Sequence, residues 1–125
     1  MKPIIAANAP EAIGPYSHAI KSSVGMVFLS GQIGIDPKTG EMKNKTLSEE
    51  VHQVFSNIKA VLEAGDLTLK NVVKSTVYLK DMNEFPEVNK IYAGYFTDHL
   101  PARACVEVSR LPKDARVEIE VIAVE

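Results

Sequence analysis

The sequence predicts an α+β fold in which two helices cover one face of a mixed β-sheet. Two amphipathic segments alternate with runs of β-branched and aromatic residues, in the order strand, strand, helix, strand, helix, strand, strand. No repeat, low-complexity segment or linker divides the chain, so we expect one domain over residues 1–125. With 46% hydrophobic and 24% charged residues, the chain has the composition of a globular protein with one modest core.

The first two predicted strands flank a short turn. Residues 18–22 and 26–30 lie on either side of Val24 and Gly25, which favours an antiparallel hairpin. Further along, the stretch DPKTGE at residues 36–41 has proline and glycine where a turn requires them.

The clearest element is the first helix. Thr46 with Glu49 three residues later resembles a capping box, and Gly65 marks the expected end. Between them, apolar residues recur at helical spacing: Val51, Val54, Phe55, Ile58, Val61 and Leu62. This spacing predicts a helix that buries one face.

A third strand is predicted over residues 72–80, where Val73, Val77 and Leu79 alternate with polar residues and Tyr78. A second helix is predicted over residues 85–96. Its expected buried stripe consists of Phe85, Val88, Ile91, Tyr92 and Tyr95.

The last two predicted strands, residues 102–110 and 117–124, are expected to form a hairpin across the loop LPKDA. Both faces of the final strand carry apolar residues, Ile119 and Val121 on one and Ile122 and Val124 on the other. Since the helices cover only one face of the sheet, we expect the open face to form the contact of a homo-oligomer.

Charge and composition exclude several classes of function. Fourteen basic and sixteen acidic residues give a net charge of -2 with no run of lysine or arginine, so no nucleic-acid partner is expected. The N-terminus lacks a secretory segment and no apolar run approaches the roughly 18 residues of a membrane span, which predicts a cytoplasmic protein without a membrane partner. One cysteine and three histidines at unrelated spacings predict neither an internal disulfide nor a zinc site.

The stretch PARACVEV places a permanent charge, Arg103, inside an apolar strand. A period of two assigns Ala102, Ala104, Val106 and Val108 to the face under the helices, and Arg103, Cys105, Glu107 and Ser109 to the open face. With the final strand paired beside it, Glu118 or Glu120 is expected within reach of the guanidinium. Two interpretations stay open: an interfacial ion pair, or a pocket between subunits in which the guanidinium binds a small carboxylate.

Several stretches resemble the YjgF/RidA family of reactive-intermediate deaminases: IGPYSHA, FLSGQIGIDPKTGE, STVYLKDMNEF, VNKIYAGYF and PARACVEVSRLPKDARVEIEVIAV. The resemblance covers essentially the whole chain. It implies a chorismate-mutase-like fold and a homotrimer whose sheets face inward as a barrel-like core, with ligand pockets between subunits. It also implies hydrolysis of 2-imino acids released by pyridoxal-phosphate-dependent dehydratases, 2-iminobutanoate and 2-iminopropanoate with its enamine form 2-aminoacrylate, to 2-keto acids and ammonia. No cofactor and no metal are implied.

The resemblance also assigns roles to individual residues. Arg103 is expected to hold the substrate carboxylate, and Glu118 to orient or activate the attacking water. Backbone groups of Cys105 are expected beside the imine nitrogen. The remaining pocket residues implied by the resemblance are Tyr16, Ser30, Gly31 and Asn89.

Other functions are weighed beside the deaminase. The same residues would serve a binding module that holds a keto acid or amino acid without converting it. Ribonuclease activity or translation inhibition, also attached to the family, is disfavoured by the acidic balance, and a holdase chaperone stays an alternative. Cys105 is either a thiolate nucleophile beside Arg103 or a small buried side chain, and the second interpretation is favoured.

Three further residues stand out in the sequence. His18 occupies a position where many family members have glutamine, and we expect a structural role for it. His99 lies in a short 97–101 loop that is expected to shape the pocket rim. Glu120 is interpreted as a surface or interface charge.

Overall fold

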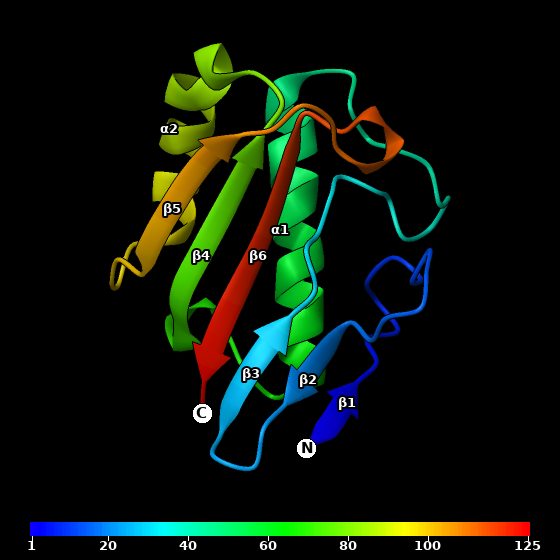
Figure 1. Ribbon diagram of the computed structural model, residues 1–125, viewed down its shortest axis with the longest axis vertical. Coiled ribbons are helices and arrows are strands. Elements are labelled where there is room, and N and C mark those ends of the chain that lie inside the picture. Colours follow the sequence, from blue (N-terminus) through cyan, green and yellow to red (C-terminus); the bar gives the residue numbers. More distant parts are fainter.

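The computed structural model describes residues 1–125 as a six-stranded mixed sheet with two helices against one face (Figure 1). The helices are α1 Leu47–Ala64 and α2 Phe85–Tyr95, and short 3-10 turns occur at Leu69–Asn71, Met82–Glu84 and Pro112–Asp114. The strands are β1 Lys2–Ile4, β2 Ala19–Lys21, β3 Met26–Leu29, β4 Val72–Leu79, β5 Ala102–Glu107 and β6 Val117–Val124. Their order across the sheet is β1-β2-β3-β6-β4-β5, so the α+β prediction is confirmed.

The predicted N-terminal hairpin is confirmed. β2 and β3 pair antiparallel with Ala19 opposite Leu29, and the turn places Gly25 at a φ of +82°, a conformation that favours glycine. β1 adds a further strand beside β2, which the sequence analysis did not predict. Three residues that include a proline are too short to show a period of two, so the sequence carries no signal for β1.

Helix α1 forms as predicted. Thr46 is its N-cap, with the side-chain oxygen accepting a hydrogen bond from the Glu49 backbone N–H at 3.1 Å, and Gly65 follows the last turn. The six predicted apolar residues are each at most 1% exposed. Complete burial of an aliphatic or aromatic side chain stabilises a fold by roughly 1.5–3 kcal/mol, so this stripe holds the helix on the sheet.

Helix α2 joins the same core through aromatic contacts. The Phe55 ring stacks on Tyr95 with centroids 4.1 Å apart and meets the Tyr92 ring edge-on at 5.8 Å. Val88 and Tyr92 are buried, as the predicted stripe requires. Neither helix has the length and apolar composition needed to cross a membrane.

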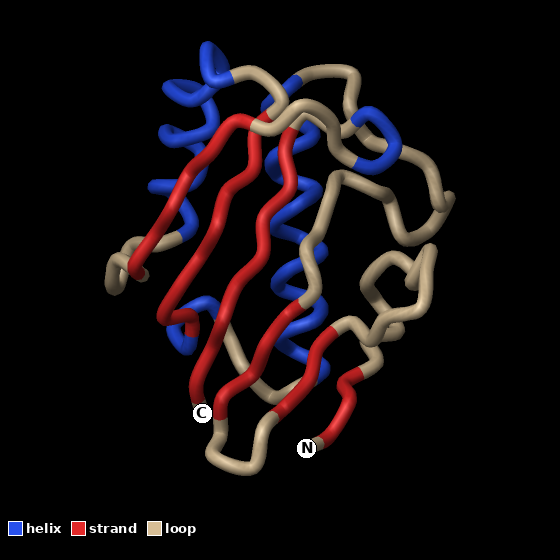
Figure 2. Tube along the Cα trace, viewed as in Figure 1, coloured by secondary structure: helices blue, strands red, loops and turns tan.

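The prediction of a C-terminal hairpin is wrong. β5 pairs parallel with β4, and β6 runs antiparallel between β3 and β4, so β4 separates the last two strands (Figures 1 and 2). The segment between β4 and β5 contains α2, whose length allows a parallel crossover. The loop after β5, which contains LPKDA, then carries the chain past the end of β4 (Figure 2).

The predicted buried face of β4 needs one correction. Val77 and Leu79 are buried as predicted, but Val73 is 42% exposed. A β-bulge lies at this point, because Val72 pairs with Ala123 while Lys74 pairs with the adjacent Ile122. The unpaired extra residue reverses the alternation, so Val72 takes the buried place that the sequence analysis assigned to Val73.

The second face of the sheet has no helix over it. Inward and outward residues alternate strictly along β6, with Ile119 and Val121 buried under the helices and Ile122 and Val124 on the open face. Phe28 and Val106, 43% and 42% exposed, show that the open face is partly apolar.

Candidate functional site

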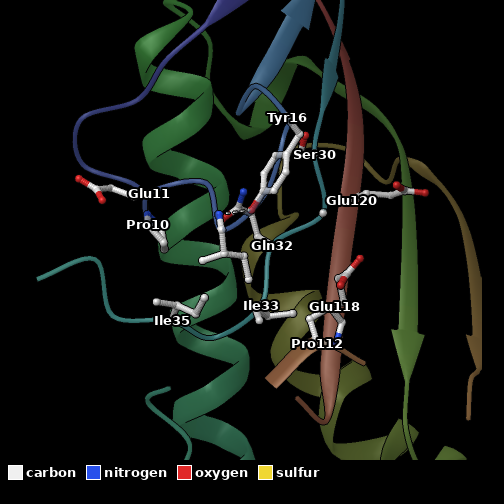
Figure 3. Close-up of a pocket in the computed structure, with 12 residues that line it drawn as sticks. Pro10, Glu11, Tyr16, Ser30, Gln32, Ile33, Ile35, Pro112, Glu118 and Glu120 are labelled. Atoms are coloured by element: carbon white, nitrogen blue, oxygen red, sulfur yellow. Dashed lines mark hydrogen bonds between the residues drawn. The ribbon is translucent and has the colours of Figure 1, made fainter. Parts of the chain in front are cut away.

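A cavity of about 420 Å³ lies at the end of the sheet where β3 leaves β6 (Figure 3). Its walls come from the N-terminal loop before β2, the segment that follows β3, the 3-10 turn at Pro112–Asp114, and β6. Twelve residues line it: Pro10, Glu11, Ile13, Tyr16, Ser30, Gly31, Gln32, Ile33, Ile35, Pro112, Glu118 and Glu120. This size is adequate for a small metabolite.

Glu118 is the most chemically distinctive group in the cavity. A Cβ atom added to Gly31 would lie 2.9 Å from Glu118 Cδ and nearer still to Oε2, so the carboxylate occupies space that only glycine leaves free. Burial raises the pKa of the Glu118 carboxyl, and the charge of Glu120 raises it further. The close backbone approach expected at Gly31 is therefore an approach to Glu118.

A backbone bridge sets the register between Glu118 and the segment after β3. The Gln32 N–H donates to the Ile119 carbonyl at 2.9 Å, and the Ile119 N–H donates back to Gln32 at 3.1 Å. Gln32 is a cavity residue that the sequence analysis did not select. In the sequence Gln32 directly follows Ser30 and Gly31, which were both expected to line the pocket. This adjacency is the sequence signal that could have identified Gln32.

The other cavity residues selected from the sequence lie on loops around Glu118. The Ser30 hydroxyl donates to the Ser17 carbonyl at 2.7 Å, which fixes the chain as it leaves β3. Tyr16 is 44% exposed, and its hydroxyl oxygen accepts a hydrogen bond from the Ile13 N–H at 3.3 Å. The structure therefore gathers Tyr16, Ser30, Gly31 and Glu118 in one cavity.

Arg103 lies on the face opposite to the predicted one. Its Nη1 donates to Asn89 Oδ1 of α2 at 2.8 Å, and its Cζ lies 4.8 Å from the Tyr92 ring centroid and 5.5 Å from that of Phe85. The reason is the pairing with β4, which sets Arg103 opposite the buried Ser75. Directly opposed residues of a sheet share a face, and that face carries the helices.

The same correction applies to the neighbours of Arg103. Cys105 packs against the helix-covered core, and the Glu107 carboxylate accepts a hydrogen bond from the Met82 N–H at the start of a turn before α2. Ala104 and Val106 consequently belong to the open face, where Val106 is 42% exposed.

The predicted proximity of Arg103 to a carboxylate of β6 is also wrong within one chain. Glu118 stands opposite Tyr78 on the open face, whereas Arg103 stands opposite Ser75 on the helix face, and β4 lies between their strands. The candidate residues therefore form two groups. One is the cavity group around Glu118, and the other is Arg103 with Asn89 and Cys105 at the β5 edge.

Cys105 has the properties of a packed thiol. Burial raises its pKa above the ordinary value, an effect that the nearby Arg103 charge opposes as the smaller contribution. A nucleophilic cysteine requires the opposite shift, toward the thiolate. The structure favours the small packed side chain, which is partly buried here, over the nucleophile.

His18 has the structural role expected for it. The buried imidazole accepts a hydrogen bond from the Ala6 N–H at Nδ1, 2.9 Å away, so its Nε2–H donates to the Pro10 carbonyl at 2.8 Å. These two bonds hold the loop that carries Pro10 and Glu11 into the cavity wall. His99 instead hydrogen-bonds the Val72 carbonyl and does not line this cavity.

All the charged residues that line the cavity are acidic. Glu11, Glu118 and Glu120 are its only charged lining residues, and no lysine, arginine or histidine is among the twelve. An anionic ligand would meet three carboxylates and no cation. The cavity of one chain therefore lacks a cation that would bind a carboxylate. Such a cation is present in Arg103, at the β5 edge of the sheet.

The fold and the site define an α+β protein with a half-buried glutamate in a cavity of metabolite size. The chain belongs to the YjgF/RidA family: the family model described as "Endoribonuclease L-PSP" matches residues 6–125.

Relatives in this family carry different names. The RutC family protein PH0854 of Pyrococcus horikoshii is 55% identical over 120 residues, which cover 96% of this chain and 94% of the relative. The 2-iminobutanoate/2-iminopropanoate deaminase of Salmonella typhimurium is 48% identical over 126 residues, covering 98% and 97% of the two chains. The crystal structure of E. coli TdcF with bound serine is similar with a TM-score of 0.93 at 40% identity, covering 100% and 99%.

Proposed function

We propose that this chain hydrolyses small 2-imino acids, 2-iminobutanoate and 2-iminopropanoate, to 2-keto acids and ammonia. The observation that carries the proposal is the Glu118 carboxylate, held against Gly31 in a cavity with its pKa raised by burial. The name of the Salmonella relative supports the same reaction. Such imines form in pyridoxal-phosphate-dependent dehydration of serine and threonine, so those dehydratases would supply the substrate.

The reaction requires one water and, starting from the protonated imine, three proton transfers. Water adds to the electrophilic C2 carbon while one of its protons passes to a base, which leaves a hydroxyl and an amine on the same carbon. The base returns this proton to the amine nitrogen. The C–N bond then breaks and the C=O bond forms as the hydroxyl gives its proton to the base, which passes it to the departing ammonia. A carboxylate whose pKa is raised toward neutral pH is suited both to accepting and to returning a proton, and this favours Glu118 as the base.

We further propose that Arg103 of a second copy completes each site, in a homotrimer with its sites between subunits. The cavity alone has no cation, and Arg103 is exposed at the free edge of the sheet. Asn89 and the rings of Tyr92 and Phe85 orient the guanidinium. Its remaining N–H donors are free to bind a substrate carboxylate in a bidentate manner.

The open face of the sheet supports the same assembly. Phe28 and Val106 are large apolar residues left partly exposed on it. Association through this face would remove them from water, as expected for an apolar patch of a soluble chain.

The decisive experiment adds the purified protein to a threonine dehydratase reaction and follows 2-keto acid formation under conditions where spontaneous imine hydrolysis is slow. The parent protein is expected to accelerate 2-keto acid formation. Arg103→Ala is expected to lose about 100-fold or more of this acceleration, because the residue that binds the substrate carboxylate is gone. A folded parent that gives no acceleration would contradict the proposal.

A second candidate function is the binding of a small amino or keto acid without turnover. The serine found in E. coli TdcF favours it, since that protein is similar over the whole chain. The two functions differ in the dehydratase assay. A binding module would show serine or 2-keto acid affinity by calorimetry with no acceleration, and Arg103→Ala would remove the affinity.

A further inference from the structure

A second carboxylate stands beside Glu118. Glu118 and Glu120 are two residues apart on β6, project from the same face and both line the cavity (Figure 3). Tyr78 lies directly opposite Glu118 on β4, and its hydroxyl donates to Glu120 Oε1 at 2.6 Å. The three side chains form a cluster that crosses from β6 to β4.

The two carboxylates have unequal surroundings. Glu120 receives the Tyr78 hydrogen bond, whereas Glu118 receives none from this chain and lies against Gly31. A hydrogen bond to a carboxylate favours its ionised form, and two neighbouring carboxylates resist being ionised together. Tyr78 therefore fixes the Glu120 carboxylate in place, whereas the Glu118 carboxylate is left free to exchange a proton with a ligand.

The shift on Tyr78 agrees with this division. Its hydrogen bond to Glu120, followed by burial and the charges of Glu120 and Glu118, raises the pKa of Tyr78 to about 12. The phenol thus remains a hydrogen-bond donor throughout the physiological pH range and does not compete as an acid.

Other charged groups near the cluster are few. Lys74 of β4 lines a second pocket together with Glu120 and does not line the cavity. Glu11 and Tyr16 of the N-terminal loop line the cavity itself. By the alternation of β4, Lys80 follows Tyr78 on the open face near the first residues of β6.

We propose that Glu120 and Tyr78 are a positioning pair for the reaction, in which the Tyr78 hydroxyl fixes the Glu120 carboxylate beside Glu118 and the Glu120 charge makes Glu118 the proton-exchanging group. Tyr78 acts only through Glu120. The inference rests on the proposed function for its catalytic meaning, but the electrostatic coupling is a property of the folded protein and is measured without turnover.

The test is a carboxyl NMR titration of ¹³C-glutamate-labelled protein, with Glu118 assigned by Glu118→Gln. In Glu120→Gln the Glu118 titration is expected to move to lower pH, because removing a neighbouring negative charge makes ionisation easier. In Tyr78→Phe the Glu118 titration is expected to move in the same direction by a smaller amount, because the Glu120 carboxylate is no longer held beside it by the Tyr78 hydroxyl. Tyr78→Phe removes only a hydroxyl, so the fold is retained and checked by circular dichroism.

Glu125→Gln is the matched control. It also removes one glutamate charge, at the residue after β6, where Glu125 pairs with Lys21 at 2.6 Å and does not line the cavity. The proposal that Glu120 and Tyr78 act on Glu118 would be overturned by either of two results. One is a Glu118 titration that does not move in Glu120→Gln, and the other is one that moves equally in Glu125→Gln.

The same variants give a second readout in the imine assay. The pH limb of kcat/KM that belongs to Glu118 is expected to move to lower pH in Glu120→Gln, with a severalfold change in rate at a pH on that limb. If the parent hydrolyses no imine while the NMR shifts appear, the proposed function fails and the coupling stands. If hydrolysis is normal and the Glu118 titration and rate limb do not move, the pair fails and the function stands.

Discussion

Arg103 and Glu118 lie on opposite faces of the same sheet, with β4 between their strands. One substrate molecule cannot contact both within a single chain. If both residues serve the reaction, they must come from different copies, and this makes the proposed assembly testable by mixing variants.

Arg103→Ala and Glu118→Gln are each expected to lose about 100-fold in kcat/KM, since one removes the carboxylate anchor and the other the proton-transfer group. Unfolding the two variants together and refolding them as mixed oligomers is expected to restore roughly one quarter of the parent activity, if chains assort at random and each site takes one residue from each of two neighbours. Native mass spectrometry verifies the mixing. Mixed oligomers that remain inactive would show that the sites do not combine these residues across subunits.

Gly31→Ala is expected to reduce kcat by about tenfold or more, because the new methyl group would occupy the place of the Glu118 carboxylate and displace it from the reacting atoms. The matched control is Gly94→Ala in α2, where an added Cβ meets no atom within 4 Å. Steady-state kinetics and urea unfolding separate the two effects. Equal losses of activity in both variants would argue against a close-approach role for Gly31.

His18→Leu is expected to lower the free energy of unfolding by about 1–3 kcal/mol, since the buried Ala6 N–H and the Pro10 carbonyl lose their partner. It should also raise KM, because the loop that carries Pro10 and Glu11 into the cavity wall is released. His18→Gln offers an acceptor and a donor in a similar place and is expected to recover most of both properties. Chemical denaturation and kinetics on the pair check this, and a His18→Gln variant as impaired as His18→Leu would refute the two-bond account.

Glu118→Gln is expected to be more stable than the parent at neutral pH. The folded pKa of Glu118 is raised above its ordinary value of 4.5, so the folded state binds the proton more tightly than the unfolded state. The resulting stability is fully present below pH 4.5 and is lost as the pH rises through the raised folded pKa. The advantage of the glutamine should therefore grow over that interval.

Urea midpoints of the parent and Glu118→Gln, measured from acid to neutral pH, provide the comparison. A difference that is constant with pH would mean that the carboxylate carries no electrostatic cost in the fold. Such a cost, if found, is what a binding or catalytic group would impose on the stability of its scaffold.

One buried ion pair shows what pattern analysis overlooks. The Glu50 carboxylate, fully buried on α1, accepts hydrogen bonds from the backbone N–H and Nε of Arg116 at 2.7 and 2.9 Å. In the sequence Glu50 is one of two adjacent glutamates in the first turn of a helix, where acidic residues are common. Nothing local distinguishes it from its half-buried neighbour Glu49, because its partner lies 66 residues away.

The sequence by itself determined the elements whose signal lies within consecutive residues: α1 with its Thr46 cap, the stripe of α2, the turn at Gly25 and the alternation of β6. Only the tertiary structure decided which strands are neighbours. β5 and β6 are adjacent in sequence order, yet each pairs with β4. The β5 pairing set the face of Arg103, and the β6 pairing set the bulge at Val73 and the meeting of Tyr78 with Glu120. The physical reason is that periodicity is a local property of the chain, whereas strand pairing depends on contacts between distant segments that compete for the same sheet edge.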